Sequence, residues 1–365
     1  MSLILSNEDV EKVLSMKLCL EALEEAYREM GAGRAASSPR CDIVGPVSRN
    51  GTSNAHYGLK SMGGVVPKAG TGAIRINSDL IHWPTVDGVT RRVKIPAAMN
   101  KYYVGLILLF SCETGEPLAL FPDGFLQRMR VGGASGLGAK HLARKDAQTV
   151  GLIGSGWQAG SQLMALCEVR AIQKIKVYSP NTEHRRQFAA EMTEILGVEV
   201  VPVERAEEAV RGSDIVHTAT NAIEPIVFGR WLEEGTHTGC IRHCELDAEL
   251  YNRAEVILLH SNKQIGVIHS VHSEKTEEFP ELQKGWEHPQ QDQIKVRWET
   301  LPDIGDLLVG RAKGRQNDRQ ITCFNNNIGM GLQFAAVGSR VYQEARKRGL
   351  GHEIPTEWLT QTVHP

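Results

Sequence analysis

The segment from Thr149 to Gly160 holds the residues whose types and spacing point most directly to chemistry. A short apolar run ending at Ile153 passes directly into Gly154-Ser-Gly-Trp-Gln-Ala159. In such a turn the first glycine permits a tight bend, the second lets the backbone approach a pyrophosphate, and the third small residue lets helix and strand pack closely. The N-terminus of the next helix then faces the anion. The segment predicts a dinucleotide-binding turn, with candidate contacts Gly154, Ser155, Gly156, Trp157, Gln158 and Ala159.

The residues around this turn read as one βαβ unit, which strengthens a motif that is weak on its own. A helix is expected over Ala159–Val169 and a second strand over Lys174–Tyr178. At the end of that strand an aspartate would favour NAD by bonding the ribose 2′-hydroxyl, but this chain has Ser179. A basic side chain beside this serine, Arg185 or Arg186, could accept the 2′-phosphate of NADP(H). The sequence therefore favours NADP(H) and leaves NAD(H) open. The remaining candidate cofactor contacts are Asn181, Arg185, Thr218, Ala219 and Thr220.

A capped helix start with solvated arginines at 185 and 186 is the alternative interpretation of the segment after Ser179.

Composition places the chain among ordinary globular proteins. It has 365 residues, 41% of them hydrophobic and 23% charged, which suits about two domains. The net charge is −2 with no dense basic stripe, so no nucleic acid and no membrane surface is expected as a partner. The chain has no run of 18 apolar residues, and the apolar stretch in Met1–Ser6 is too short for the hydrophobic region of a signal peptide. A cytoplasmic protein is therefore expected.

Seven scattered cysteines fit reduced thiols better than a disulfide framework. Cys240-Ile-Arg-His-Cys244 lacks a second ligand pair at recognisable spacing, so no metal site is expected.

The order of elements indicates an α/β fold in two parts. An amphipathic helix is expected from about Ser6 to Gly31, followed by β-type runs up to about residue 121. A glycine-rich helix then spans about Asp123–Arg144, and its glycines indicate close packing against the cofactor or another helix. Strands and helices alternate from 149 to about 260, which predicts a Rossmann-type doubly wound parallel sheet. A last helix, Gly331–Lys347, is expected to return to the first part.

Several motifs in fixed order carry a family resemblance. They are Phe121-Pro-Asp-Gly, Arg130, the glycine turn, Ser213–Asn221, Glu245-Leu-Asp247 and Leu307–Gly310. This series resembles the ornithine cyclodeaminase/mu-crystallin family. The resemblance implies a homodimer in which residues 1–122 and 321–365 form an α+β substrate-binding and dimerisation domain, and residues 123–320 form the dinucleotide-binding Rossmann domain. It also implies hydride exchange at an amino or imino carbon.

The resemblance assigns carboxylate binding to Arg40, Arg75 and Arg130. Arg75 stands where relatives carry lysine, and Lys60 stands where cyclodeaminases carry glutamate and alanine dehydrogenase relatives an arginine. Guanidinium groups with a lysine suit the carboxylate of an amino or imino acid, although each one alone is more often a solvated charge. The candidate catalytic residues are Lys60, Arg75 and His243.

One departure bears on the reaction. Cyclodeaminases use an aspartate at the end of the strand ahead of the Glu-Leu motif, but Thr238–Glu245 has none there. His243 could take over acid–base work, since a histidine titrates near neutral pH, or it could be a simple loop histidine. In addition, Gln333 stands where relatives often place an aspartate.

The expected function is an NAD(P)H-dependent oxidoreductase of amino acid metabolism, acting on the amino or imino carbon of an amino acid as an imino acid reductase or amino acid dehydrogenase. One alternative is ornithine cyclodeaminase with recycled NAD. Another, of a different class, is a non-catalytic, crystallin-like ligand-binding protein. Fold alone cannot separate them, because function resides in the site.

Overall fold

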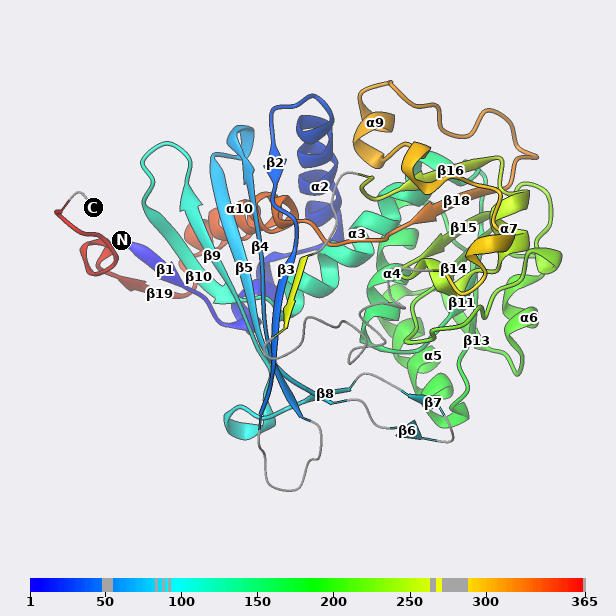
Figure 1. Ribbon diagram of the computed structural model, residues 1–365, viewed down its shortest axis with the longest axis horizontal. Coiled ribbons are helices and arrows are strands. Elements are labelled where there is room, and N and C mark those ends of the chain that lie inside the picture. Colours follow the sequence, from blue (N-terminus) through cyan, green and yellow to red (C-terminus); the bar gives the residue numbers. More distant parts are fainter. Residues whose placement is uncertain are drawn as a thin grey trace.

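Two sheets with their helices form the body of the molecule (Figure 1). The computed structural model describes residues 1–47, 55–82, 85–86, 89–90, 93–262, 267–270 and 288–363. One sheet has ten strands and mixed directions, and the other has seven strands; β6 (Thr85–Val86) and β7 (Val89–Thr90) form a separate ribbon. The α/β fold expected from the sequence is confirmed.

The seven-stranded sheet is entirely parallel, with the order β13-β12-β11-β14-β15-β18-β16. Apolar clusters on its two faces involve α3, α4 and α5 on one side and α6 and α7 on the other. It is therefore doubly wound, as a Rossmann-type sheet is. Its elements are β11 (Thr149–Ile153), α4 (Trp157–Val169), β12 (Lys174–Tyr178), α5 (Thr182–Leu196), β13 (Glu199–Pro202), α6 (Ala206–Val210), β14 (Ile215–Thr218), β15 (His237–Cys240), α7 (Ala248–Arg253), β16 (Val256–Leu259) and β18 (Thr322–Asn325).

The position of β18 corrects the expected domain boundary between residues 320 and 321. β18 lies between β15 and β16 in the parallel sheet, so residues 322–325 belong to the Rossmann part of the chain. The expected Rossmann range also contains β17 (Val267–Ser270), which pairs with β3 of the ten-stranded sheet, and after Asn325 the chain crosses to that sheet again.

The ten-stranded sheet is built from both ends of the chain together with β17, and its path is β17-β3-β4-β5-β9-β10-β1-β19. Beside this path, β2 (Ala36–Ser37) pairs with β4 and β8 (Val93–Ile95) pairs with β5. The path strands are β1 (Ser2–Ile4), β3 (Cys41–Pro46), β4 (His56–Val66), β5 (Thr71–His82), β9 (Val104–Ser111), β10 (Pro117–Pro122), β17 (Val267–Ser270) and β19 (His352–Ile354).

Helices α1 (Asn7–Val13), α2 (Met16–Gly31) and α10 (Gly331–Arg348) share one apolar core with this sheet. The predicted return of the last helix to the first part of the chain is confirmed. The remaining short helices are α9 (Ile304–Leu308), η1 (Pro67–Ala69), η2 (Met99–Lys101), η3 (Gly229–Trp231), η4 (His243–Glu245), η6 (Gln291–Gln293), η7 (Trp298–Thr300) and η8 (Thr356–Leu359).

The single helix expected over Ser6–Gly31 is two helices. Ser6 caps α1, since its hydroxyl accepts a hydrogen bond from the Asp9 amide and the Asp9 carboxylate accepts one from the Ser6 amide. Ser15 then caps α2 by accepting from the Leu18 amide at 3.2 Å. A serine side chain that hydrogen-bonds a backbone amide of the following turn competes with helix continuation, so the helix is interrupted at residues 14 and 15.

The glycine-rich helix α3 (Gly124–Leu142) lies between the two sheets (Figure 1). A Cβ on Gly132 would lie 2.3 Å from the Ser161 carbonyl oxygen of α4, and one on Gly138 would lie 2.3 Å from the ring of Phe324 in β18. On the opposite side, Gly133 faces Leu23 of α2. The expected close packing of this helix is therefore against other elements of the protein.

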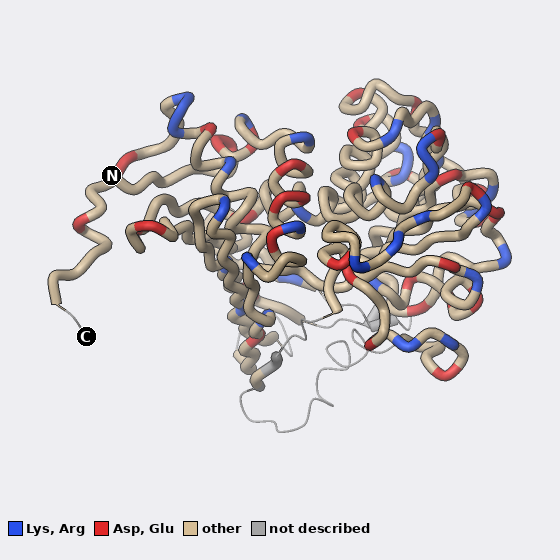
Figure 2. Tube along the Cα trace, turned by 90° about the horizontal axis from the view of Figure 1, so that it is seen from above, with Lys and Arg blue, Asp and Glu red and all other residues tan. Residues whose placement is uncertain are grey.

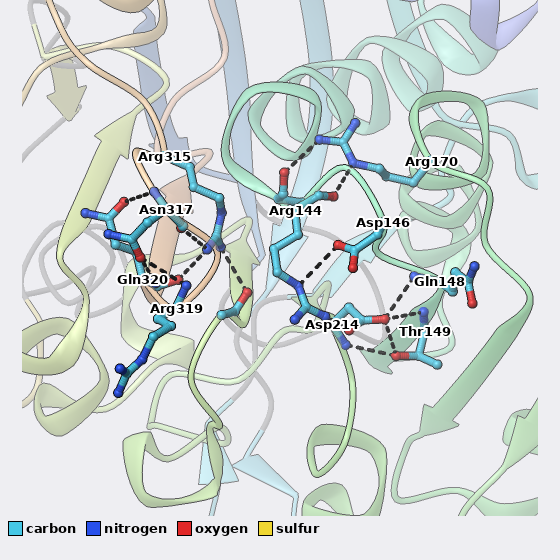
Figure 3. A network of polar contacts seen from close by, with 12 residues as sticks. Arg144, Asp146, Gln148, Thr149, Arg170, Asp214, Arg315, Asn317, Arg319 and Gln320 are labelled. Carbon is cyan, nitrogen blue, oxygen red and sulfur yellow. Dashed lines mark hydrogen bonds and ion pairs between the residues drawn. The ribbon is translucent and has the colours of Figure 1, made fainter.

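Arginine side chains hold the C-terminal end of α3 to the Rossmann sheet (Figure 3). Arg170 donates to the carbonyls of Ala139, Lys140 and Ala143, and Arg315 donates to the carbonyl of Leu142 at 2.6 Å. The last carbonyls of a helix have no intrahelical partners, so these guanidinium groups satisfy them. Arg144 pairs with Asp214, whose carboxylate also accepts from the amides of residues 148 and 149.

Figure 2 shows Lys and Arg interspersed with Asp and Glu over the trace, in keeping with the net charge of −2. Among the described helices, none has the length and apolar character needed to cross a membrane.

The crossing of β4 over the start of α10 yields a prediction. A Cβ on Gly64 would lie 2.1 Å from the Leu332 amide nitrogen, a backbone atom that cannot move aside. We expect Gly64→Ala to lower the free energy of unfolding by about 3 kcal/mol, measured by urea denaturation. Gly72→Ala in β5 is the matched control, because its nearest neighbours would be 3.6 and 3.8 Å away. Equal stability of the two variants would contradict this packing.

Candidate active site

The glycine turn after β11 has the shape that a pyrophosphate-binding turn requires. Gly154 has a φ of +117°, and a Cβ there would lie 2.3 Å from the Ala219 carbonyl oxygen. Its amide donates to the Tyr178 carbonyl at 2.8 Å, which ties the turn to the end of β12. Gly156, by contrast, has nothing within 4 Å of where a Cβ would stand. The turn is therefore closed on the protein side and open on the other.

A cleft of about 820 Å³ opens at this turn, along the carboxyl ends of β11, β12 and β14. Ligands of open α/β sheets bind at this edge. The space and the cradle at Gly154 fit a dinucleotide. The lining residues are Ile153, Gly154, Ser155, Gly156, Trp157, Gln158, Tyr178, Ser179, Pro180, Asn181, His184, Ala219, Thr220, Asn221, Ala222, Ile223, Glu224 and Ile226. Of the predicted cofactor contacts, the structure brings all to the lining except Ala159, Arg185 and Thr218.

Ala159 and Thr218 support the cleft from behind. Ala159 is fully buried in α4, as its packing role requires. Thr218 is also fully buried, and its hydroxyl donates to Glu245 at 2.8 Å.

Glu245 holds the β14 loop in place, a role that the sequence analysis did not assign. Its carboxylate accepts hydrogen bonds from the Thr218 hydroxyl, from the amide and hydroxyl of Thr220, and from the Arg242 amide. Burial raises the pKa of Glu245, whereas these hydrogen bonds lower it. The Glu-Leu motif thus fixes the cleft wall through four donors rather than by contact with a ligand.

Arg185 is not available to a 2′-phosphate, which corrects one of the predicted contacts. The residue is 2% exposed, and its guanidinium donates to the Ser179 carbonyl and to Glu204, both at 2.7 Å. A side chain that already bonds a carboxylate and a carbonyl beneath the strand end cannot turn into the cleft without losing both bonds. Ser179 does face the turn, where the Ser155 hydroxyl donates to its hydroxyl at 2.8 Å. Asn181 caps α5 by accepting from the His184 amide.

A strip of charged side chains lies on the inner face of the ten-stranded sheet. Antiparallel register places Lys60 of β4 opposite Asn77 of β5, and Met62 opposite Arg75. Directly paired residues lie on the same face of a sheet. The inward positions of β5 begin with Thr71 and Ala73 beside α10 and continue with Arg75, Asn77 and Asp79, all buried. Arg75 is therefore a buried residue and not a solvated surface charge.

Most of these charges are paired in the protein. Arg75 contacts the Asp123 carboxylate through Nε at 2.7 Å and Nη2 at 2.6 Å. Lys60 contacts Asp79 at 2.9 Å, and Lys94 reaches the same carboxylate at 2.9 Å. Burial raises the pKa of Asp79, but the two ammonium groups lower it further, so it lies below its ordinary value. Arg40 pairs with Asp42 through two hydrogen bonds, at 2.7 and 2.5 Å.

Arg130 is different, because its partners are neutral. It is 5% exposed, and its guanidinium donates to the side-chain oxygens of Gln127 and Gln333. Over the described part of the chain, no carboxylate lies within ion-pair distance of it. Burial, with Arg75 nearby, lowers the pKa of Arg130 to about 9, so the group remains a cation at neutral pH. A buried cation without an anion is costly for a protein to keep, and a bound carboxylate would relieve that cost.

Arg75 and Arg130 are brought together by Phe334, whose ring centre lies 5.5 Å from one guanidinium carbon and 5.2 Å from the other. His243 lies elsewhere, with its ring 5.9 Å from His288 and 6.0 Å from Trp298. The structure therefore joins two of the predicted substrate residues and places His243 in an aromatic cluster. The described residues contain no group of three or more His, Cys, Asp or Glu that could hold a metal ion.

Besides Glu245, three residues around Arg75 and Arg130 were missed by sequence reasoning. Asp123 was visible as part of the Phe-Pro-Asp-Gly motif, and Gln333 as a departure from relatives, but neither was assigned a partner. Gln127 gave no signal, since an amide on a helix carries no pattern of its own.

The comparisons with known proteins agree with this geometry. A model of the ornithine cyclodeaminase/mu-crystallin family matches residues 88–349. The chain belongs to this family. It is 30% identical to the alanine dehydrogenase of Archaeoglobus fulgidus over 360 residues, covering 97% of this chain and 98% of that relative.

Two solved structures share the whole fold. The Thermococcus litoralis Δ1-pyrroline-2-carboxylate reductase, in complex with NADH and L-proline, has a TM-score of 0.72 and 30% identity over 96% of this chain and 100% of that one. An archaeal alanine dehydrogenase dimer with bound NAD has a TM-score of 0.73 and 27% identity over 97% and 99% of the two chains. The predicted family, fold and enzyme class, a nicotinamide-dependent oxidoreductase, are thereby confirmed.

Proposed function

We propose that this enzyme reduces the C=N bond of an imino acid, or oxidises the corresponding amino acid in the reverse direction. The observation that carries the proposal is the buried guanidinium of Arg130, which has no carboxylate of the described residues within ion-pair distance, in a chain that also has a dinucleotide cleft. A bound nicotinamide cofactor supplies or accepts the hydride. The relatives named above act on or bind a small amino or imino acid, which is the substrate class that this site fits.

The cations of the inner sheet face have separate roles in this proposal. Arg130 binds the substrate carboxylate, since a guanidinium and a carboxylate form two parallel hydrogen bonds. Arg75, held by Asp123, lies on the same Phe334 ring and adds positive charge beside it. Lys60, paired with Asp79, holds the proton that the substrate nitrogen gains on reduction, whereas Arg40 is paired with Asp42 and is given no part in the reaction. Holding the carboxylate orients the carbon that reacts.

The two sheets divide the work in the same way. The ten-stranded sheet and its helices bind the substrate and form the dimer, and the seven-stranded sheet binds the cofactor. The boundary between these two parts lies after β18, where the chain crosses at residues 326–330. Ornithine cyclodeamination remains the competing reaction, and no observation favours it: β15 ends at Cys240 and is followed by Ile241 and Arg242, where cyclodeaminases would need an acid.

The first prediction of this proposed function tests the reaction and the role of Arg130. We expect oxidation of NAD(P)H with Δ1-pyrroline-2-carboxylate or with a 2-oxo acid plus an amine. Arg130→Ala should lower kcat/KM by about 10²-fold or more, because removing one partner of a buried charge pair costs about 2–5 kcal/mol. Cofactor affinity, measured by fluorescence titration, should change far less.

Arg34→Ala is the matched control, since Arg34 is an exposed arginine paired with Glu29. Release of ammonia and proline from ornithine, at a rate comparable to the best imine reduction, would show that the enzyme is a cyclodeaminase instead.

The second prediction concerns the choice of cofactor, for which we propose NADP(H). Ser179 leaves the strand end without the acid that would repel a 2′-phosphate, and Asn181 and His184 are polar neighbours in the cleft. NADPH should give a kcat/KM about 10-fold above that of NADH, as one charge-assisted hydrogen bond allows. Ser179→Asp should reverse the ratio. An equal or NADH-favouring ratio in the unmodified enzyme would remove the argument.

The third prediction concerns assembly as a homodimer through the outer face of the ten-stranded sheet. Apolar side chains gather there, and Ile43, Val65 and Leu106 are each about two-fifths exposed. A broad exposed apolar face of this kind marks a protein interface, and closed two-fold symmetry is the commonest arrangement. Leu106→Glu should give a monomer by light scattering at micromolar concentration. Ile195→Glu on α5, at another exposed apolar position, should leave the dimer intact; a monomeric unmodified enzyme would contradict the proposal.

A further inference from the structure

A chain of buried hydrogen bonds begins at Arg130 and ends at the segment where the polypeptide crosses between the two sheets. The Arg130 Nη1 donates to Gln333 Oε1 at 2.9 Å, and Gln333 Nε2 lies 2.8 Å from the Tyr27 hydroxyl. That hydroxyl lies 2.7 Å from His260 Nε2, and His260 Nδ1 bonds the Ile328 carbonyl. Tyr27, Gln333 and His260 are all fully buried.

The chemistry of the groups allows one direction of donation along this chain. Arg130 has only donors, so Gln333 must present its oxygen to Arg130 and its amide nitrogen to Tyr27. The Tyr27 oxygen then accepts from Gln333, and its proton must go to His260 Nε2. His260 is consequently neutral, with its proton on Nδ1, which donates to the Ile328 carbonyl. Burial lowers the pKa of His260 to about 3, which agrees with a neutral ring.

The elements that supply these residues come from both parts of the molecule. Tyr27 lies on α2, Arg130 on α3 and Gln333 in the first turn of α10, whereas His260 follows β16 of the Rossmann sheet. The crossing segment also packs directly on Arg130, since a Cβ on Gly329 would lie 2.7 Å from Nη1. The Met330 amide donates to the same Gln333 oxygen that accepts from Arg130.

We propose that Gln333, Tyr27 and His260 are positioning residues that fix the Arg130 guanidinium for the substrate carboxylate while leaving its charge uncompensated. The inference rests on the proposed function, because it assigns Arg130 to carboxylate binding. Gln333 provides an oxygen that orients the guanidinium without neutralising it. Tyr27 and His260, together with the Met330 amide, keep the Gln333 amide in the orientation that presents its oxygen to Arg130, so Tyr27 and His260 act on the substrate through Arg130.

Two variants separate orientation from charge. Tyr27→Phe keeps the ring but removes the hydroxyl, so the Gln333 amide nitrogen loses its partner at 2.8 Å and keeps the longer hydrogen bond to the Arg130 carbonyl at 3.4 Å. Gln333→Glu places a carboxylate beside Arg130, which competes with the substrate for the cation. The probes are L-proline and L-prolinamide, which differ in the carboxylate, and binding is measured by calorimetry with saturating NADH or NADPH.

We expect Tyr27→Phe to raise the Kd of L-proline about 10-fold and Gln333→Glu to raise it more, about 30-fold or above, from the size of charge-assisted hydrogen bonds. L-prolinamide binding and cofactor affinity should change less than 3-fold on the same basis. In steady-state kinetics the effect should fall mainly on KM.

Thr71→Val is the matched control, because it also removes a buried hydroxyl that bonds α10, through the Ala335 carbonyl at 3.0 Å, and is not part of the chain to Arg130. It should lower the melting temperature without changing the Kd of L-proline. If Tyr27→Phe behaves like Thr71→Val, losing stability but not proline affinity, the chain is merely structural and the proposal is wrong.

A crystal structure of Tyr27→Phe provides a readout that needs no substrate, and Arg130 should there be displaced from Gln333. An unmoved Arg130 would overturn the inference even if the enzyme reduces imino acids. Conversely, a displaced Arg130 in a protein that neither binds L-proline nor reduces imines would overturn the proposed function and leave the positioning chain standing.

Discussion

The close packing of α3 between the two sheets is the constraint on which the rest of the structure depends. Glycine costs a helix about 1 kcal/mol of intrinsic stability at each position, so a run of glycines is kept only where contact repays it. Here Gly132 touches the backbone of α4, Gly133 touches α2 and Gly138 touches Phe324 of β18. Asp123 precedes this helix and Arg130 lies in it. Asp123 and Arg130 are thus placed between the two sheets by a helix that cannot move toward α2, α4 or β18 without steric overlap.

The charges buried beside α3 fall into two kinds. Burying an ion is costly unless a partner of opposite sign is supplied, and the pairs of Lys60 with Asp79 and of Arg75 with Asp123 meet that cost within the protein. Arg130 has amide oxygens only, which orient a guanidinium but do not neutralise it. The charge of Arg130, which these amides do not neutralise, can therefore pair with an anionic ligand. An anion that reaches Arg130 gains more than it would from an already paired arginine.

Local patterns predicted most of the fold, because the information for them lies within a few residues. The βαβ unit, the glycine turn and the last helix follow from hydrophobic period and glycine placement, and the structure has them. The break at Ser15 was missed because the apolar period runs through it, and a cap is decided by one hydroxyl. The four-residue strand β18 was assigned to the wrong part of the chain, since so short an apolar run does not reveal which sheet it joins.

The site was less predictable, because its decisive contacts join distant residues. Gln333 and Tyr27 are 306 positions apart, and His260 and Tyr27 are 233 apart. Arg185 could be recognised as a cation near the cofactor, but its rotation under the strand toward Glu204 depends on β13 and on burial that no local pattern encodes. Arg75 and Arg130 were identified through the family motif, whereas the neutral hydrogen-bond partners of Arg130, Gln127 and Gln333, emerged only with the packing.

The loop after β15 decides which reaction this scaffold can support. Its two carboxylates are already engaged: Glu245 accepts from four donors around Thr218 and Thr220, and Asp247 caps α7 while accepting from the Gly229 amide. Ile241, at the end of the strand, packs against the apolar core of the Rossmann sheet. Ring-closing loss of ammonia in cyclodeaminases uses a carboxylate that handles a second amine, and both carboxylates of this loop are engaged within the protein. Hydride exchange needs an oriented carboxylate, a proton on the nitrogen and a nicotinamide, and in the proposed function Arg130, Lys60 and the cleft at Gly154 supply them.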